Sequence, residues 1–379
     1  MLKRRTLRIK AMKTIFAVRQ SREANLELAK AYVRDSFLPD LNSMELQDKE
    51  LLKQQSKEAI KIFNLNYSNT SFKSNEGSAD VINDVVNDAI SFYYRENNKD
   101  LKLYRTQMIN EAEKVYDRYI QMLNLLIDLK VIADNDGKRD HSNFVKNLLI
   151  KAIESNPSRE TINLRKNLDW AEYQSEIRQW FKEVRSDEKY QYYIDLKNAS
   201  FKDDKAIVSH IVKDVIFKSD VVDKFMEDRD LNWSEDRAII KSLVTKTVKS
   251  IEEVNLDDFE LQELSYNWED DKAFFVKLYE DTNQVEPKYE ALIARKTKNW
   301  EIDRIAITDK IILDMAIAEM INFQSIPIKV TINEYIEVAK KYSTPKSKLF
   351  INGVLDVIAE ELQSSGDVKK SGRGLIDNK

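Results

Sequence analysis

Cysteine is absent from this 379-residue chain, and histidine occurs only twice, as His141 and His210. The absence of cysteine excludes disulfide frameworks, zinc ribbons, iron–sulfur clusters and cysteine nucleophiles. The two histidines do not have the His-Glu-x-x-His spacing of a zinc protease. We therefore predict that the chain is not an enzyme and has no catalytic residue, no metal and no cofactor.

Glycine and proline are also scarce, with 6 and 5 residues respectively. Because the turns between β-strands depend on these two residue types, we do not expect a β-sandwich, a β-barrel or a glycine-rich nucleotide-binding fold. Three of the six glycines, Gly366, Gly372 and Gly374, lie close to the C-terminus. The rest of the chain is rich in Leu, Ile, Lys, Glu and Asp, which predicts an all-α fold.

Long apolar runs are missing too, because no stretch of about 18 apolar residues occurs in the sequence. The basic N-terminus lacks the apolar segment of a secretory signal peptide. We expect a cytoplasmic protein without a membrane partner.

Charge is segregated along the chain, although the net charge is only −4. Residues 1–22 carry eight lysines and arginines, residues 338–355 carry four lysines, and neither window contains an acidic residue. The rest of the chain therefore has a net charge of −16. An acidic body with two basic windows suits RNA or DNA that is bound at one place and repelled elsewhere. A merely solvated basic surface is the alternative.

The first basic window is interleaved with apolar residues, among them Leu7, Ile15 and Phe16, so we expect an amphipathic helix there. Further along, polar loops separate helical patterns that we place at residues 36–62, 79–97, 100–132, 144–154, 160–197 and 205–229. An Asn-Trp-x-x-Asp-Arg motif at residues 232–237 returns at residues 299–304. Either a helix–loop–helix unit is used twice, or the similarity is due to chance.

The C-terminal third has the clearest pattern. Residues 304–323 are apolar nearly all round, which predicts a central buried helix. Asp309, Asp314 and Glu319 interrupt this helix, and they must face solvent, a partner or a paired base because a lone buried carboxylate is costly. Ile326-Pro327 should end it. A capping box at Thr331–Glu334 then starts the next helix, and Ser347 starts the last one.

These segments resemble the bacterial NusB family. The resemblance rests on residues 309–319, on Ile332-Asn333-Glu334, and on the Phe-Ile-Asn-Gly-Val-Leu-Asp segment at residues 350–356. The opening Arg4-Arg5-Thr6-Leu7-Arg8 is similar to the arginine-rich start of that family. The match covers residues 1–22 and about 271–363, and some 200 residues between them have no counterpart in the shorter members.

The resemblance implies a non-enzymatic, all-helical protein that binds the boxA element of ribosomal RNA leader transcripts. It acts jointly with the ribosomal protein NusE in the RNA polymerase antitermination complex. The family's RNA face implies RNA-binding roles for Arg4, Arg5, Arg8, Lys346 and Phe350, and Lys348 adds a cation near the same helix start. The family's NusE face implies partner-binding roles for Phe16, Asp303 and Asp309.

We accordingly expect a two-part helical bundle of NusB type with an additional inserted helical lobe. Residues 1–35 would form the arginine-rich helix, 36–200 the inserted lobe, 201–363 the NusB-like bundle and 364–379 a disordered tail. An alternative is a helical protein–protein scaffold that has lost RNA specificity, because Thr6 and Ile9 stand where the family usually has more arginine and a glutamate. An enzyme with a NusB-like appendage would need a glycine-rich cofactor loop and a catalytic cysteine, which the sequence lacks.

Overall fold

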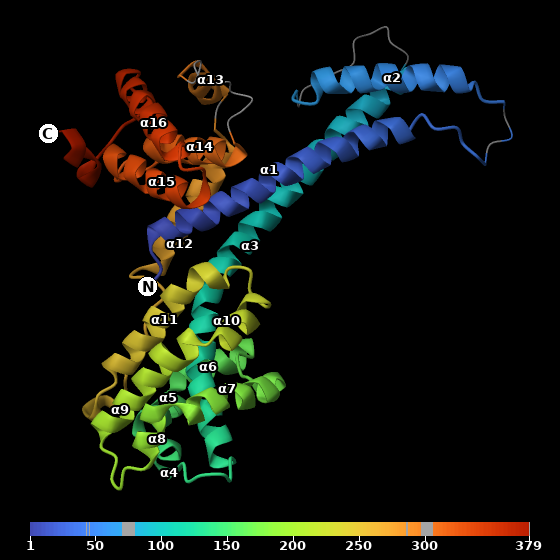
Figure 1. Cartoon of the computed structure of the whole chain (residues 1–379). Coiled ribbons are helices and arrows are strands. Elements are labelled where there is room, and N and C mark those ends of the chain that lie inside the picture. The colour runs from blue at the N-terminus through green and yellow to red at the C-terminus, as the bar shows by residue number, and fades with distance from the viewer. Residues whose placement is uncertain (43, 45, 70–79, 286, 297–305, 379) are drawn as a thin grey trace. The chain divides into compact units, whose positions relative to one another are not determined.

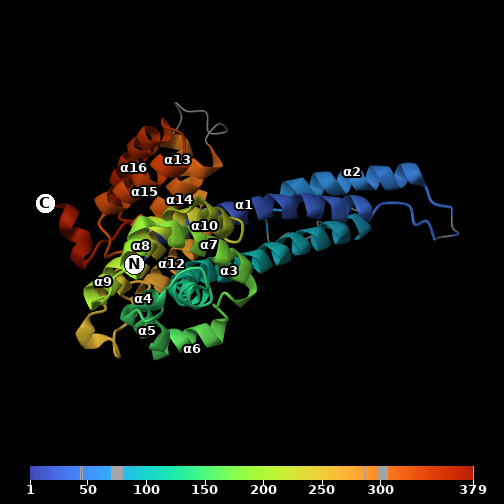
Figure 2. The same ribbon diagram turned by 60° about the horizontal axis from the view of Figure 1, so that its bottom comes forward.

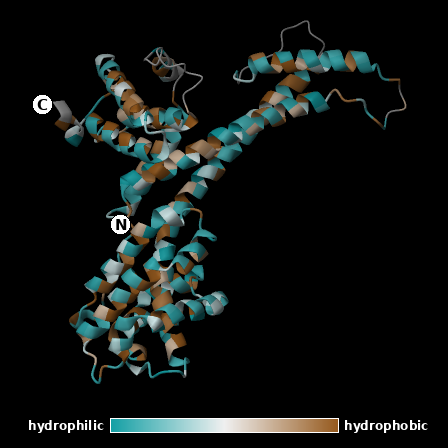
Figure 3. Cartoon of the chain, in the orientation of Figure 1, coloured by the Kyte–Doolittle hydropathy of each residue, from teal (hydrophilic) through white to brown (hydrophobic). Residues whose placement is uncertain are grey.

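The computed structural model describes residues 1–378 except 43, 45, 70–79, 286 and 297–305. Over these residues it contains helices and no β-strand, which confirms the all-α prediction (Figure 1). The chain divides into two compact units: residues 1–4 and 109–272 form the first, and residues 5–108 and 273–379 the second. In the described part, no helix is both long and apolar enough to cross a membrane, and Figure 3 shows hydrophilic residues along each of the long helices.

The first unit is built around the second part of α3 (Asp80–Asp134), which Figure 2 shows nearly end-on among shorter helices. Its core includes three tryptophans, Trp170, Trp180 and Trp233, each 1% exposed. The shorter helices are α4 (Ser142–Val145), α5 (Leu148–Ser155), α6 (Pro157–Lys166), α7 (Gln174–Ser186), α8 (Glu188–Ile194), α9 (Phe201–His210), α10 (Asp220–Glu227) and α11 (Trp233–Ser250).

Part of the second unit is a three-helix arm, made of the C-terminal half of α1 (Arg4–Asp35), α2 (Lys49–Asn66) and the first part of α3. These three helices lie side by side in Figures 1 and 2. They share one apolar cluster, which we call the arm core and which consists of Ala29, Val33, Phe37, Ala59, Phe63, Ile82, Val86, Ala89 and Ile90. Burial of this cluster is what holds the three helices together.

The remainder of the second unit is a C-terminal bundle of α12 (Trp268–Asn283, from residue 273), α13 (Pro287–Lys296), α14 (Ile307–Asn322), α15 (Ile328–Tyr342) and α16 (Ser347–Ser364). Residues 311–320 of α14 are all buried, which confirms the predicted central helix. The expected end of α14 before Pro327 and the expected start of α16 at Ser347 are confirmed as well.

The compact units do not follow the expected lobe at 36–200, because residues 36–108 belong to the second unit and residues 109–200 to the first. The physical reason is α3, which continues through the break that we predicted near residues 97–100. There the buried Asn25 of α1 donates to Asn97 at 3.0 Å and to Asp100 at 2.8 Å. The polar residues that suggested a loop thus form hydrogen bonds between α1 and α3.

Three helix predictions were too long. The described residues of the segment 36–48 are not helical. Helix α2 starts only after Asp48, whose side chain accepts from the backbone N–H groups of Glu50 and Leu51. The predicted helix 160–197 is divided at Asn167, which has a φ of 51°, and again at Asp187, which caps α8. The predicted helix 205–229 is interrupted by a π-helical stretch at Ile211–Val215 and restarts behind the cap Ser219.

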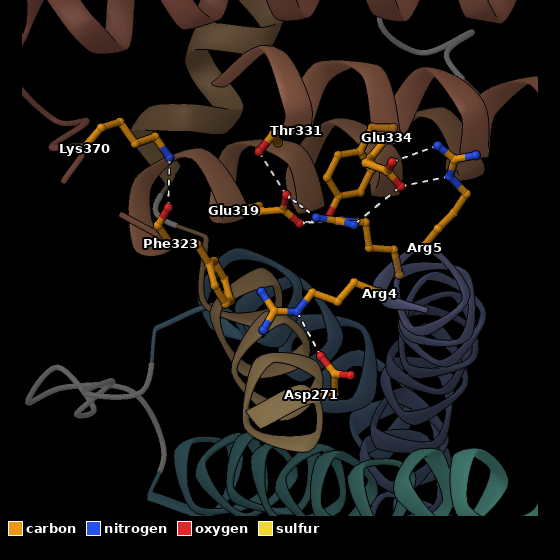
Figure 4. Close-up of polar contacts among 10 residues, drawn as sticks. Arg4, Arg5, Asp271, Glu319, Phe323, Thr331, Glu334 and Lys370 are labelled. Carbon is orange, nitrogen blue, oxygen red and sulfur yellow. Dashed lines mark hydrogen bonds and ion pairs between the residues drawn. The ribbon is translucent and has the colours of Figure 1, made fainter. Parts of the chain in front are cut away.

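The C-terminal tail differs from the disorder we expected at residues 364–379. A 3₁₀ helix covers Gly372–Asn378. The backbone N–H of Ser371 donates to the carbonyl oxygen of Gln324 at 3.1 Å, and Lys370 Nζ donates to the carbonyl oxygen of Phe323 at 3.0 Å (Figure 4). These bonds fix the tail on the turn between α14 and α15.

Candidate nucleic-acid interface

The arginine-rich start of α1 forms a helix, as predicted, and buries one apolar stripe. Leu7, Ala11, Ile15 and Val18 are at most 1% exposed and follow one another at helical spacing. Ion pairs from the same helix reach α14 and α15, so that α1 is held on the C-terminal bundle of its own unit.

Arg8 lies inside the bundle, where it pairs with Glu319 of α14. Its Nε and Nη2 atoms donate to the two carboxylate oxygens at 2.7 Å each, and the two residues are 3% and 0% exposed. Burial alone would lower the pKa of Arg8, but the charge and hydrogen bonds of Glu319 raise it overall. Because the Arg8 guanidinium is buried in this bidentate ion pair, it does not face solvent, and Arg8 anchors α1 on α14 in this structure.

Two further donors complete the buried site around Glu319. Thr331 Oγ1 donates to this carboxylate at 2.9 Å and the Tyr335 hydroxyl donates at 3.2 Å. The rings of Phe274 and Tyr335 lie 5.2 and 5.9 Å from the Arg8 guanidinium carbon. Both charges are therefore paired and hydrogen-bonded, which is the condition under which a buried ion pair is tolerated.

Arg5 and Arg4 are nearer to solvent. Arg5 donates to both carboxylate oxygens of Glu334 at 2.9 and 2.7 Å, and its side chain is 48% exposed (Figure 4). Arg4, in the first unit, donates to Asp271 at 3.0 Å and is 43% exposed. All three arginines of the opening motif thus have carboxylate partners within their own units.

The predicted capping box at Thr331–Glu334 is wrong. Helix α15 begins at Ile328, directly after the extended Pro327, and the side chains of Thr331 and Glu334 are used by Glu319 and Arg5. Thr331 and Glu334 have the spacing of a capping box, but Thr331 bonds to α14 and Glu334 bonds to α1.

Two of the three carboxylates of α14 are paired with an arginine, which confirms for these two the paired base that we allowed for. Asp314 accepts from Arg19 at 2.5 Å, and Asp309, which is 5% exposed, accepts from the hydroxyl of Ser343. Glu319 takes Arg8. Two of these three partners come from the basic first window.

A second group of cations surrounds Tyr342, at the C-terminal end of α15. Lys13 Nζ of α1 lies 5.8 Å from the centre of this ring, and Lys341 Nζ lies 5.3 Å from it. Since Lys13 belongs to the first acid-free window and Lys341 to the second, Tyr342 marks the point at which the two windows meet. We call Lys13, Lys341 and Tyr342 the lysine–tyrosine cluster.

The start of α16 lies just beyond this cluster in the chain. Lys346 and Lys348 are exposed, and neither they nor Lys341 have a carboxylate partner within the described residues. Phe350, which we predicted to contact RNA, is 9% exposed and packs in the bundle, whereas Phe16 on α1 is 38% exposed.

Arg5 contacts Glu334, and Lys13, eight residues further along α1, contacts Tyr342, which is eight residues further along α15. Helices α1 and α15 therefore run in the same direction. Eight helical residues span about 12 Å. The start of α16 is therefore level with Lys13 rather than with Arg5 or Arg8. The structure brings the two basic windows together, but at a different part of α1 from the one we predicted.

The family model described as "NusB family" matches residues 238–360. The chain is 34% identical to the transcription antitermination protein NusB of Dictyoglomus thermophilum over 139 residues, which are 37% of this chain and 89% of that protein. The chain belongs to the NusB family.

Two further proteins of the NusB family are similar over shorter parts. The NusB protein of Chloroherpeton thalassium is 46% identical over 106 residues, and that of Salinibacter ruber 43% over 105 residues, each 28% of this chain. The chain covers 50% and 66% of these two relatives, less than two thirds of their lengths. No solved structure matches the chain.

The NusB match includes α14, α15 and most of α16, and with them most of the candidate site. Lys341, Tyr342, Lys346, Lys348, Phe350 and Asp309 lie inside it, whereas Arg4, Arg5, Arg8, Lys13 and Phe16 lie before it. Asp303, predicted to bind a partner, lies outside the described residues, as does the second Asn-Trp motif. The sequence predictions missed Lys13 and Tyr342, although the absence of acids around both was visible.

Proposed function

We propose that this NusB-family chain is a transcription antitermination factor that binds single-stranded boxA-type RNA of ribosomal RNA leader transcripts. The lysine–tyrosine cluster carries the proposal, because it gathers cations from both acid-free windows around one aromatic ring. Single-stranded RNA is bound by cations that neutralise phosphates and by flat side chains on which bases stack. Lys346 and Lys348 extend the cationic surface along the start of α16.

The arginines of the opening motif take different parts in this proposal. Arg5 and Arg4 can exchange a carboxylate for a phosphate, because an exposed ion pair is worth only about 0.2–1 kcal/mol. Arg8 positions α1, and Phe350 positions α16, through their buried contacts. Each would affect RNA through the helix that it holds.

NusE is the proposed protein partner, within the RNA polymerase antitermination complex. Phe16 offers an exposed aromatic side chain on α1 for such a contact. Asp309 is buried behind Ser343, so it would act by holding the turn after α15. Asp303 remains part of the proposed partner face.

The test is a gel-shift or fluorescence titration of boxA-type RNA with Lys13→Ala/Lys341→Ala. Loss of two phosphate contacts should weaken binding and flatten the slope of log affinity against log salt by about 1.4. The matched control is Lys53→Ala/Lys57→Ala, which removes two exposed lysines from α2 in the same unit and should leave the slope unchanged. An equal slope in wild type and in the Lys13/Lys341 variant would contradict the proposal.

The second candidate is a protein–protein scaffold of NusB fold that has lost RNA specificity. The observation in its favour is that Arg4, Arg5 and Arg8 all have carboxylate partners. It predicts that the wild-type chain binds NusE but shows no preference for boxA-type RNA over a scrambled RNA, even at low salt. The same titration, with and without NusE, separates the two.

A further inference from the structure

An open pocket of about 600 Å³ lies in the first unit, between α3 and the segment that leads into α12. Three aromatic side chains line it, Tyr116, Tyr266 and Trp268, and Tyr266 is 90% exposed. Three carboxylates, Glu113, Glu263 and Glu269, line it as well. The volume falls within the range of about 300–1,000 Å³ that is typical of ligand sites.

Negative charge is in excess among the residues that line this pocket. Glu113 is engaged, since it accepts from Trp268 Nε1 at 3.2 Å and from Lys272 at 2.9 Å. In the described part of the chain, neither Glu263 nor Glu269 has an ion-pair partner. Lys166, the one cation among the described lining residues, is held by Asp117 at 2.6 Å. The pocket thus attracts a cation and repels a phosphate.

An independent observation also points to a ligand. Ser265 lines the pocket and is 2% exposed, and its hydroxyl oxygen has no hydrogen-bond partner among the described residues. Buried hydroxyls normally have a partner, because an unsatisfied one costs free energy. A donor group in the pocket would supply it once the Ser265 side chain, whose oxygen is closed to solvent in this structure, rotates towards that group.

We propose that this pocket binds the guanidinium group of an arginine side chain from a protein partner. A guanidinium is planar and cationic, so it stacks on aromatic rings and donates to carboxylate and hydroxyl oxygens at the same time. A nucleotide base would stack on the same rings, but its phosphates would meet Glu263 and Glu269. The pocket and the lysine–tyrosine cluster have no residue in common, and this proposal does not depend on RNA binding.

The experiment titrates the full-length ¹⁵N-labelled chain with the capped tripeptide acetyl-Gly-Arg-Gly-amide and follows the indole N–H resonance of Trp268, assigned with Trp268→Phe. We expect a saturable shift of that resonance. The same tripeptide with citrulline, which keeps the shape and loses the charge, should bind at least about tenfold more weakly. Spermidine tests whether a free polyamine is the better ligand, and cytidine monophosphate tests a nucleotide.

Variants locate the binding groups. Glu263→Gln/Glu269→Gln should weaken the arginine peptide about tenfold, and Ser265→Ala about threefold. Glu172→Gln/Glu227→Gln, which changes two exposed carboxylates of the same unit outside the pocket, should leave the affinity unchanged. Equal binding of the citrulline peptide, tighter binding of spermidine, a shift with cytidine monophosphate alone, or an unaltered affinity of Glu263→Gln/Glu269→Gln would each overturn the proposal.

Discussion

At the scale of single residues, Glu319 organises the bundle around α14. It accepts hydrogen bonds from Arg8, Thr331 and Tyr335, which come from the basic helix and from α15. The sequence predicted that the carboxylates of α14 face solvent, a partner or a paired base, because burial of an unpaired charge is unfavourable. It did not predict that one partner would be an arginine assigned to RNA.

Arg8→Ala should therefore destabilise the protein strongly. The substitution leaves Glu319 buried without its counter-ion, and breaking a buried pair on one side costs about 3–5 kcal/mol. Urea unfolding followed by circular dichroism measures the change. Arg5→Ala, which removes an exposed pair, is the matched control and should cost less than about 1 kcal/mol. Similar midpoints for Arg8→Ala and wild type would show that Arg8 is not an anchor.

The pair Arg5–Glu334 predicts a pH dependence. The hydrogen bond from Arg5 lowers the pKa of Glu334 below its ordinary value of 4.5. A lowered pKa in the folded state gives stability that is present above 4.5 and is lost as the pH falls through the folded-state pKa. The stability difference between wild type and Arg5→Ala should hold from neutral pH down to about 5 and then shrink. A difference that stays constant to about pH 3 would contradict this assignment.

At the scale of elements, the arm depends on its apolar cluster, and Phe63 of α2 is fully buried there. Phe63→Ala should cost about 3–5 kcal/mol through lost burial and the cavity that it leaves. We expect faster hydrogen exchange of the α2 amides. Leu65→Ala on the same helix removes a side chain that is 72% exposed and serves as the control. If α2 exchanges at the same rate in both variants, the arm core does not hold it.

Elements were predictable where local pattern alone decides them. The start of α16 at Ser347 and the all-round burial of α14 follow from the local sequence, and both were predicted. The length of α3 was not predictable. Asn97 and Asp100 are polar and suggested a loop, but in the structure they accept hydrogen bonds from Asn25 of α1. The capping box failed for the same reason, since Thr331 and Glu334 have better partners elsewhere in the bundle.

At the scale of the whole molecule, the segregation of charge was visible in the sequence, and the second unit places its two acid-free windows together at Tyr342. The sequence did not show which turn of α1 lies next to the second window. That depends on the ion pairs by which Arg5, Arg8 and Arg19 hold α1 on α14 and α15. The predicted RNA face and the lysine–tyrosine cluster therefore share the second window but use different turns of α1.

Cross-linking of boxA-type RNA that carries 4-thiouridine, followed by mass spectrometry of the peptides, tests the central claim most directly. The account predicts cross-links to Tyr342 and to peptides from both windows, residues 10–19 and 338–350, competed by unlabelled boxA-type RNA and not by a scrambled one. Cross-links confined to other parts of the chain, such as α2, would contradict a single RNA-binding surface formed by the two basic windows.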